Sequence, residues 1–345
     1  MRKSVGAIGV AIRIGPPPAS MPAVFDAASP QTALICAAVS DDLASARRAG
    51  LHVAELQIDF DCPESKLAQY LGWVKAIQTA AAPTPVVVTA LPSWLRHAEF
   101  AAVAHEAGSF ILQVHSLHPP AGPDAPMTLC DAGEARRAVA DAARIGVPFR
   151  VALPTYTYLA AFSAEGKLLG LSAESAPPSF PPGTILRYLR PDADALADLV
   201  AQWSAAHPAQ MTGLIWYRLP VSGDTMNWRP PTLRAVMAGR KPRADVHALA
   251  IRTAPGLFDI YLENTGDADA MLEYRIVIDW DNAALVAADA IGGFERLDAP
   301  AASVIFHPSR SPASRWIAPS QRLQAGWLRL SLDTEVRTHV WPDSP

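Results

Sequence analysis

The sequence predicts a (β/α) barrel of the TIM type followed by an antiparallel β-sandwich. Between residues 50 and 240, short apolar runs alternate with amphipathic helical stretches, and polar and aromatic residues recur just after the apolar runs. Beyond a linker at residues 239–245 the helical period disappears and strands follow one another directly. We therefore expect a barrel domain over residues 1–240 and a β-sandwich domain over residues 241–345.

Six apolar runs of strand length are expected to form a parallel sheet, because crossover helices join parallel strands. They span residues 7–14, 53–60, 85–91, 110–117, 148–153 and 213–219. Residues 64–80 are the clearest helix, since apolar side chains recur there at three- and four-residue steps. Other helices are expected over residues 99–107, 133–144 and 192–206, and proline-rich loops over residues 118–126 and 176–183.

The segment before the second expected strand is short for a complete barrel. Each βα unit takes roughly 30 residues, so two units and a strand ahead of residue 53 need more than about 60 residues. Residues 1–52 contain one convincing strand. Two alternatives stay open: residues 31–48 hold an irregular strand, or the chain lacks the opening strands of its barrel.

The carboxyl-terminal part reads as successive strands. Residues 257–263, 271–280 and 326–332 alternate between apolar and polar or run apolar. Residues 264–267, Asn-Thr-Gly-Asp, are a turn signal between the first two of these strands. A sandwich of about 100 residues fits this pattern best.

Composition excludes several partners and cofactors. A net charge of -4 over 345 residues leaves no basic excess for a phosphate backbone, so we expect no nucleic-acid partner. No apolar run approaches the roughly 20 residues that cross a bilayer, so we expect no transmembrane span. Cys36, Cys62 and Cys130 form neither a disulfide framework nor a metal-ligand spacing, and phosphate-cradling glycine motifs are absent. We expect no cofactor and no metal, and the sequence indicates no oligomeric state.

The run of residues 55–61, Glu-Leu-Gln-Ile-Asp-Phe-Asp, carries the most informative polar side chains. Because strand side chains alternate, Gln57, Asp59 and Asp61 share one face. Burying two aspartates at the end of a parallel strand is costly unless they serve a site. At roughly 6 to 7 Å between Cβ atoms the charges couple, which can make one a general acid beside an ionised partner. The simpler alternative is that Asp61 caps the helix that begins near Glu64.

Further polar and aromatic residues follow the other strands, where βα loops build barrel active sites. We expect a substrate to contact Gln57, Ser93, Trp94, Gln113, His115, Tyr156, Trp216, Tyr217, Arg218 and Trp228. Trp94, Trp216 and Trp228 are expected to be stacking platforms, because the C–H faces of sugars stack on aromatic rings. Core packing is the alternative for each aromatic residue.

Carboxylates beside aromatic residues favour a polysaccharide or oligosaccharide as partner, with Asp59 and Asp61 as catalytic residues. Hydrolysis needs a second carboxyl group within roughly 5 to 10 Å. One alternative is a non-catalytic carbohydrate-binding or envelope structural protein that keeps the cleft and lacks the acid. A second alternative is a metal-dependent polysaccharide deacetylase, with His115 and His118 beside the aspartates.

Four motifs stand in order along the chain: residues 55–61, residues 89–95 (Thr-Ala-Leu-Pro-Ser-Trp-Leu), residues 112–117 (Leu-Gln-Val-His-Ser-Leu) and residues 214–220 (Leu-Ile-Trp-Tyr-Arg-Leu-Pro). Together they resemble the bacterial domain-of-unknown-function family 3142 over about residues 5 to 330. The resemblance implies a glycoside-hydrolase-like barrel with a β-rich tail, in an exported or envelope-associated protein. The amino terminus shows no clear signal peptide.

The aspartate strand is also similar to that of chitinase-like barrels, which carries three aspartates and then a glutamate that acts as the acid. Asp59 and Asp61 match the last two aspartates. Leu56 stands in place of the first, and Pro63 stands in place of the glutamate. Glu64 is one residue out of phase, so the resemblance does not extend to chitinase-type substrate-assisted hydrolysis.

Overall fold

The structure is a computed structural model. It describes residues 8–15, 27–115, 118, 120, 122–125, 127–173, 180–221, 224, 226–299, 302–309 and 316–342. The chain forms two compact units. The amino-terminal unit comprises Met1–Asp192 and Gln202–Asn227, and the carboxyl-terminal unit comprises Ala193–Ala201 and Trp228–Pro345. The domain boundary at residue 240 stays a prediction.

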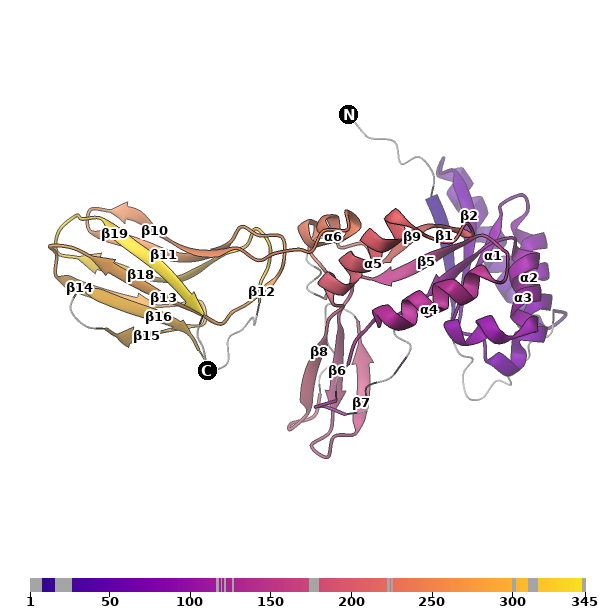
Figure 1. The fold of residues 1–345 in the computed structure, drawn as a ribbon, viewed down its shortest axis with the longest axis horizontal. Helices are drawn as coiled ribbons and strands as arrows, with labels where there is room; N and C mark the ends of the chain where they lie inside the picture. The colour runs from indigo at the N-terminus through magenta and orange to yellow at the C-terminus, as the bar shows by residue number, and fades with distance from the viewer. Residues whose placement is uncertain are drawn as a thin grey trace. The chain divides into compact units, whose positions relative to one another are not determined.

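Six parallel strands form the main sheet of the amino-terminal unit, in the order β1-β2-β3-β4-β5-β9. Figure 1 labels β1, β2, β5 and β9 of this sheet. They are β1 (Ile8–Ile14), β2 (Val53–Phe60), β3 (Val86–Ala90), β4 (Phe110–Gln113), β5 (Phe149–Pro154) and β9 (Met211–Tyr217). The mixed α/β class expected from the sequence is confirmed. The sheet is a curled half-barrel, and in the described part of the chain β1 and β9 are its two edges. The expected residues 7, 116 and 117 lie outside the described part.

Helices connect these strands. They are α1 (Pro30–Arg48), α2 (Leu67–Ala81), α3 (Ala98–Ala107), α4 (Ala132–Ala143) and α5 (Ala193–Ala205), with α6 (Pro230–Met237) further along the chain. Short 3-10 helices, η1 (Glu64–Lys66) and η2 (Pro92–Arg96), follow β2 and β3.

The alternative of a hidden strand within residues 31–48 is wrong, because this segment is the helix α1. The Ser29 side chain accepts a hydrogen bond from the Thr32 amide at 3.2 Å, which caps the first turn. Pro30 occupies that turn, where its missing N–H has no helical partner to lose. The local signals for a helix therefore outweigh the β-branched residues in the segment.

Alternation along the strands divides their side chains between two faces of the sheet. On β2, Leu56, Ile58 and Phe60 are buried, and α2 packs on this side through Tyr70 and Trp73, whose rings lie 5.6 and 5.4 Å from that of Phe60. We refer to this side as the helix-covered face. Gln57 and Asp59 point to the opposite face.

A continuous row of aromatic rings runs through the helix-covered face. The ring centroids are 5.6 Å apart for Phe60 and Tyr70, 6.1 Å for Tyr70 and Trp94, 5.7 Å for Trp94 and Phe100, 5.4 Å for Phe100 and Phe110, and 5.3 Å for Phe110 and Phe149. This aromatic row joins β2, α2, η2, α3, β4 and β5. Fully burying one such side chain contributes roughly 1.5 to 3 kcal/mol, so the row fixes the sheet against its helices.

A three-stranded antiparallel arm follows β5 and was not expected from the sequence. It consists of β6 (Tyr158–Phe162), β7 (Leu168–Ser172) and β8 (Ile185–Leu189), paired in the order β7-β6-β8 (Figure 1). Each strand has five residues, and three residues separate β5 from β6, so the segment lacks the long periodic run that marks a strand. The expected loop 176–183 lies partly outside the described residues.

The carboxyl-terminal unit contains two four-stranded antiparallel sheets, in the orders β10-β11-β18-β14 and β15-β16-β13-β19, and the pair β12-β17. The strands are β10 (Val246–Ala254), β11 (Leu257–Asn264), β12 (Ala270–Met271), β13 (Tyr274–Trp280), β14 (Leu285–Ala290), β15 (Phe294–Asp298), β16 (Ser303–Pro308), β17 (Trp316–Ile317), β18 (Arg322–Leu330) and β19 (Val336–Pro342). Ile260, Leu328, Ile276 and Phe306, two from each sheet, belong to one buried cluster.

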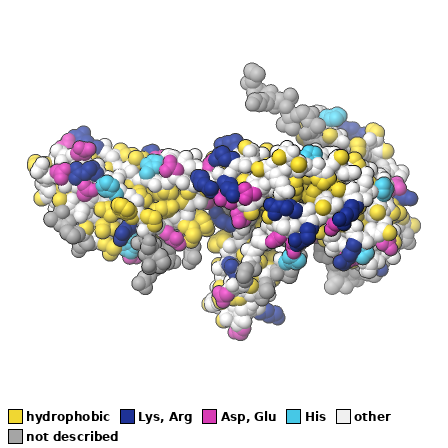
Figure 2. Space-filling view, in the orientation of Figure 1, with side chains coloured by type: hydrophobic (Ala, Val, Ile, Leu, Met, Phe, Trp, Pro, Cys, Tyr) yellow, Lys and Arg dark blue, Asp and Glu magenta, His cyan; other side chains and the backbone are white. Residues whose placement is uncertain are grey.

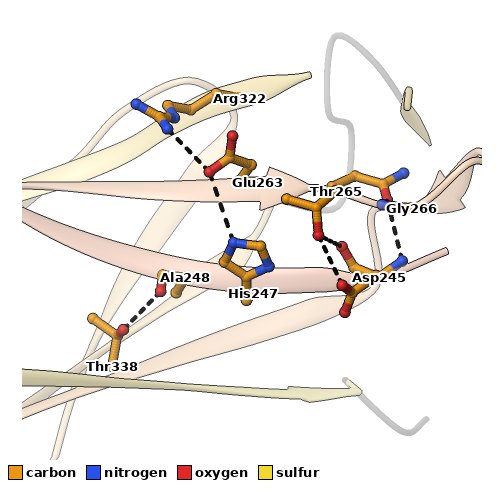
Figure 3. A network of polar contacts seen from close by, with 9 residues as sticks. Asp245, His247, Ala248, Glu263, Thr265, Gly266, Arg322 and Thr338 are labelled. Carbon is orange, nitrogen blue, oxygen red and sulfur yellow. Dashed lines mark hydrogen bonds and ion pairs between the residues drawn. The ribbon is translucent and has the colours of Figure 1, made fainter. Parts of the chain in front are cut away.

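Polar contacts join the strands of the first of these sheets (Figure 3). Glu263 on β11 lies between Arg322 of β18, at 3.0 Å, and His247 of β10, at 3.7 Å. The Thr265 hydroxyl lies 2.8 Å from an Asp245 carboxylate oxygen at the start of the same sheet. Because these ion pairs are partly exposed, each contributes little to stability, on the order of 0 to 1 kcal/mol.

Charged side chains of both signs lie on the surface. On the face drawn in Figure 2, basic and acidic side chains are interspersed. Within the described residues, no helix combines the length and the apolar character that crossing a membrane requires.

The buried hydroxyl of Tyr70 leads to a prediction about stability. Tyr70 is fully buried, and its hydroxyl has no hydrogen-bond partner in the described part of the chain. A buried unsatisfied polar group costs roughly 1 to 3 kcal/mol. Replacing Tyr70→Phe should therefore raise the free energy of unfolding by about 1 kcal/mol and the melting temperature by about 2 to 4 °C. Tyr188→Phe, at a half-exposed ring, is the control and should leave the melt unchanged. A lower melting temperature for Tyr70→Phe would contradict the prediction.

Candidate functional site

A cleft of about 740 Å³ lies on the face of the sheet opposite the aromatic row. Strand alternation places one set of side chains from β1 to β9 there. These include Arg13, Gln57, Asp59, Thr89, Ile111, Gln113, Ala152, Ile215 and Tyr217. Asp61, Ser93, His115 and Tyr156 lie just beyond the strand ends and line the same cleft. Polar residues therefore gather at the carboxyl ends of the strands, where parallel sheets build their binding sites.

Asp59 is bonded on both carboxylate oxygens. Arg13 donates to Oδ2 at 3.3 Å, and the Thr89 hydroxyl lies 3.2 Å from Oδ1. The same hydroxyl lies 3.0 Å from the Ile58 carbonyl oxygen. Thr89 on β3 therefore contacts both the Asp59 side chain and the backbone of β2. Asp61 is exposed at the end of β2, and within the described residues Asp59 has a cation, Arg13, at ion-pair distance whereas Asp61 has none.

Glu64 is committed to a different set of contacts. Its Oε2 accepts from Arg96 at 2.8 Å and lies 2.8 Å from His97 Nε2. Hydrogen bonds from Arg96, His97 and Ser93 lower the pKa of Glu64 from 4.5 to about 2. Glu64 is therefore ionised at neutral pH and is unsuited to donate a proton.

His115, Tyr156 and Tyr217 form an aromatic corner of the cleft. His115 Nδ1 lies 3.1 Å from the Tyr156 hydroxyl, and its ring stacks on Tyr217 with 5.8 Å between centroids and 13° between planes. Tyr156 meets Tyr217 edge-on at 5.6 Å. Burial lowers the pKa of His115 from 6.5 to about 4, so its imidazole is neutral at physiological pH. Gln113 donates to the His115 carbonyl oxygen at 3.2 Å and fixes the backbone of this corner.

The three-stranded arm supplies one wall of the cleft through Tyr158 and Ala173. Tyr158 meets Tyr156 edge-on at 5.1 Å, which connects the arm to the aromatic corner. Arg187 of β8 donates to the carbonyl oxygens of Pro123 and Ala125, at 2.6 Å each. These contacts tie the segment that follows β4 to the arm.

Helix α4 supplies another wall that sequence analysis missed. Glu134, Arg137, Ala138 and Asp141 line the cleft at helical spacing. The Asp131 side chain caps the helix by accepting from the Glu134 amide at 2.7 Å, and His118 Nε2 lies 3.2 Å from Glu134. The sequence signal for this wall is a charged stripe on an otherwise alanine-rich helix.

Four residues expected to bind substrate lie outside the cleft wall. Trp94, 1% exposed, and the buried Trp228 are core residues, so neither ring can serve as a stacking platform. Trp216 has the opposite strand parity from Ile215 and Tyr217 and therefore points to the other face.

Arg218 is the fourth of these residues. It pairs at 2.8 Å with the buried Asp224, which is a structural ion pair. The expected residues that do line the cleft are Gln57, Asp59, Asp61, Ser93, Gln113, His115, Tyr156 and Tyr217.

The histidines do not assemble a metal site. His115 is bonded to Tyr156 and His118 to Glu134. No three His, Cys, Asp or Glu side chains of the described residues come together as metal ligands. The donor set required for a metal-dependent deacetylase is therefore not assembled by these residues.

The fold and the cleft together define a mixed α/β protein with a polar site at the carboxyl ends of a curled parallel sheet. The chain belongs to the family described as Domain of unknown function (DUF3142), which matches residues 26–222. The resemblance seen in the four motifs is thereby confirmed over residues 26–222, a shorter span than the expected residues 5 to 330. Residues 247–331 match a second family, described as Domain of unknown function (DUF8456).

Solved structures similar to this chain include a family GH18 chitinase from Chromobacterium violaceum, with 13% identity and a TM-score of 0.37. That match covers 89% of this chain and 70% of the chitinase. The spore cortex-lytic enzyme SleL of Bacillus cereus is 11% identical with a TM-score of 0.40, covering 59% of this chain and 52% of that one. No curated protein matches the chain.

The Glu64 contacts generate a prediction about acid stability. Because the folded pKa lies below the ordinary value, ionised Glu64 stabilises the fold above about pH 4.5, and this contribution is lost as the pH falls towards 2. Glu64→Gln should lower the melting temperature at pH 7 and flatten its decline between pH 4.5 and 2. Thermal melts across this range test the prediction, with Glu99→Gln on the exposed start of α3 as control. Parallel pH profiles for the wild type and Glu64→Gln would refute it.

Proposed function

We propose that the protein binds a polysaccharide or oligosaccharide in this cleft and hydrolyses it, with Asp59 and Asp61 as catalytic residues. The observation that carries the proposal is that one cleft contains both the carboxylates of β2 and the rings of the aromatic corner. Carboxylates orient sugar hydroxyls through hydrogen bonds, and aromatic rings take the C–H faces of sugars.

Tyr217 is the best placed stacking platform. Its side chain is 45% exposed and lines the cleft. One side of the ring stacks on His115, which holds the tyrosine in place without covering the other side. Tyr158, half-buried in the wall from the arm, is the second platform. These two tyrosines take the role that the sequence assigned to tryptophans.

The two aspartates are suited to different roles. Asp59, fixed by Arg13 and Thr89, is the carboxylate placed to stabilise positive charge that develops on the sugar ring. The general acid must be another carboxyl group, and Asp61, Glu134 and Asp141 are the candidates that line the cleft. Asp61 is the first choice, because Glu134 and Asp141 on α4 already have partners, His118 at 3.2 Å and Arg144 at 2.6 Å.

We also propose a barrel and a sandwich architecture for the two parts of the chain. The six-stranded curled sheet corresponds to part of a TIM-type barrel, since its site residues lie at the carboxyl ends of its strands. The two four-stranded sheets of the carboxyl-terminal unit share one buried cluster, as the two layers of a β-sandwich do. A domain boundary near residue 240 would separate these two architectures.

A second candidate is a carbohydrate-binding protein without turnover. Pro63 stands where chitinase-like barrels have the acid, and Glu64 is held ionised by Arg96 and His97. These contacts favour a protein that keeps the cleft and lacks the proton donor.

Replacing Asp59→Asn tests the proposal. Removing the carboxylate that stabilises positive charge on the sugar ring should lower glycan turnover by roughly 100-fold or more. The melting temperature should change little, because Asn can still accept from Thr89. Purified protein is assayed against bacterial exopolysaccharides with turnover and binding read together.

The control for this experiment is Asp41→Asn on the exposed side of α1, which should behave as the wild type. Binding without turnover in the wild type would favour the second candidate. A large loss of stability in Asp59→Asn with unaltered ligand behaviour would show that Asp59 is structural.

Replacing Tyr217→Ala tests the stacking platform. An aromatic contact of roughly 0.5 to 1.5 kcal/mol corresponds to a loss of affinity of up to about tenfold. Isothermal titration calorimetry with an oligosaccharide that binds the wild type measures the change in affinity. Tyr188→Ala, at a half-exposed tyrosine of the arm that does not line the cleft, is the matched control. Equal affinities for the two variants would remove Tyr217 from the site.

A further inference from the structure

The imidazole of His115 is fixed on three sides. Its side chain is 4% exposed, although the residue lines the cleft. The Tyr156 hydroxyl lies 3.1 Å from Nδ1, the Tyr156 ring meets the imidazole edge-on at 77°, and Tyr217 stacks on it. These contacts determine the plane of the ring and the direction in which each nitrogen points.

The two ring nitrogens have different surroundings. Nδ1 has the Tyr156 hydroxyl as its partner, whereas Nε2 has no hydrogen-bond partner in the part of the chain that the structure describes. Leaving a polar atom unsatisfied in a protein interior is costly. Because His115 lines the cleft, water or a ligand in the cleft can supply the missing partner.

We propose that Tyr156 fixes the tautomer of His115, so that the imidazole presents Nε2–H to the cleft as an uncharged donor to an oxygen of the bound sugar. Of the two groups, the phenol is the stronger hydrogen-bond donor and the imidazole nitrogen the stronger acceptor. Tyr156 therefore donates to Nδ1, and the single imidazole proton resides on Nε2. The identity of the ligand rests on the proposed function, and the state of the imidazole does not.

The surroundings keep this donor uncharged. Within the described residues, the rings in contact with the imidazole are those of Tyr156 and Tyr217, and burial lowers the pKa of His115 to about 4. The charged or titratable residues that line the same cleft are Arg13, Asp59, Asp61, His118, Glu134, Arg137 and Asp141. His115 should thus be neutral above about pH 5, and it acts by positioning the ligand and not as a general acid.

The tautomer can be read without any ligand. Long-range proton–nitrogen spectra of the full chain labelled with 15N-histidine report which ring nitrogen carries the proton, and His115→Gln assigns the signal. The wild type should show the neutral Nε2–H form from pH 5 to 8. Tyr156→Phe keeps the ring contacts and removes the hydroxyl, so it should yield a mixture of tautomers. An Nδ1–H form, an imidazolium at neutral pH, or a tautomer unchanged in Tyr156→Phe would overturn the proposal.

The ligand contact is tested with hexasaccharides of glucose, N-acetylglucosamine and glucosamine. For one that binds, the Nε2 resonance should shift, and His115→Phe should weaken binding about tenfold with the loss unchanged from pH 5.5 to 8. His105→Gln, at an exposed position of α3, is the control and should bind as the wild type.

The two proposals fail in different ways. Binding that is equal in wild type and His115→Phe overturns the ligand contact while leaving the glycan cleft intact. Absence of binding to every probe and to the exopolysaccharides overturns the proposed function and the ligand contact together, and the nitrogen spectra still decide the role of Tyr156.

Discussion

The aromatic row on the helix-covered face is the packing on which the site depends. Rings from Phe60 to Phe149 form one chain of contacts across β2, α2, η2, α3, β4 and β5. Because strand side chains alternate, anchoring Ile58 and Phe60 beneath α2 forces Asp59 to the cleft. A shift of one residue in the pairing of β2 would exchange the two faces and bury the carboxylate. The apolar packing of one face thus determines the chemistry of the other.

Periodicity in the sequence predicted the parts of the fold whose pattern is local. All six strands of the parallel sheet and the helix after β2 follow from apolar runs and three- to four-residue spacing. The arm escaped prediction because its short strands are stabilised by pairing with one another, as Ala160 with Arg187 and Leu171. Helix α4 was predicted, whereas its role as a wall of the cleft depends on tertiary position, which no spacing encodes.

The same distinction explains the aromatic residues of the site. Parity along β9 separates Trp216 from Tyr217, and the sequence assigned both to the ligand although adjacent residues face opposite sides. Trp94 follows a strand, as a site residue should, but η2 turns its ring into the aromatic row between Tyr70 and Phe100. A position after a strand therefore indicates proximity to the site, and the backbone turn decides which way the side chain points.

Two carboxylates on the same face of β2 differ in their arginine partners and in their position relative to the cleft. Glu55 lies towards the amino-terminal end of the strand, and one Arg150 nitrogen lies 2.8 Å from both of its oxygens, with both side chains partly exposed. Glu55 and Arg150 therefore neutralise each other's charge. Asp59, four residues further along, has Arg13 at 3.3 Å, whose side chain is 68% exposed. A small apolar cluster of Val87, Ile111, Ala152 and Ile215 lies on the same face of the sheet, between the positions of Glu55 and Asp59. An exposed arginine can move aside at little cost in desolvation, and Asp59 lines the cleft whereas Glu55 does not, so the Asp59 carboxylate is the one placed to exchange its arginine for a ligand.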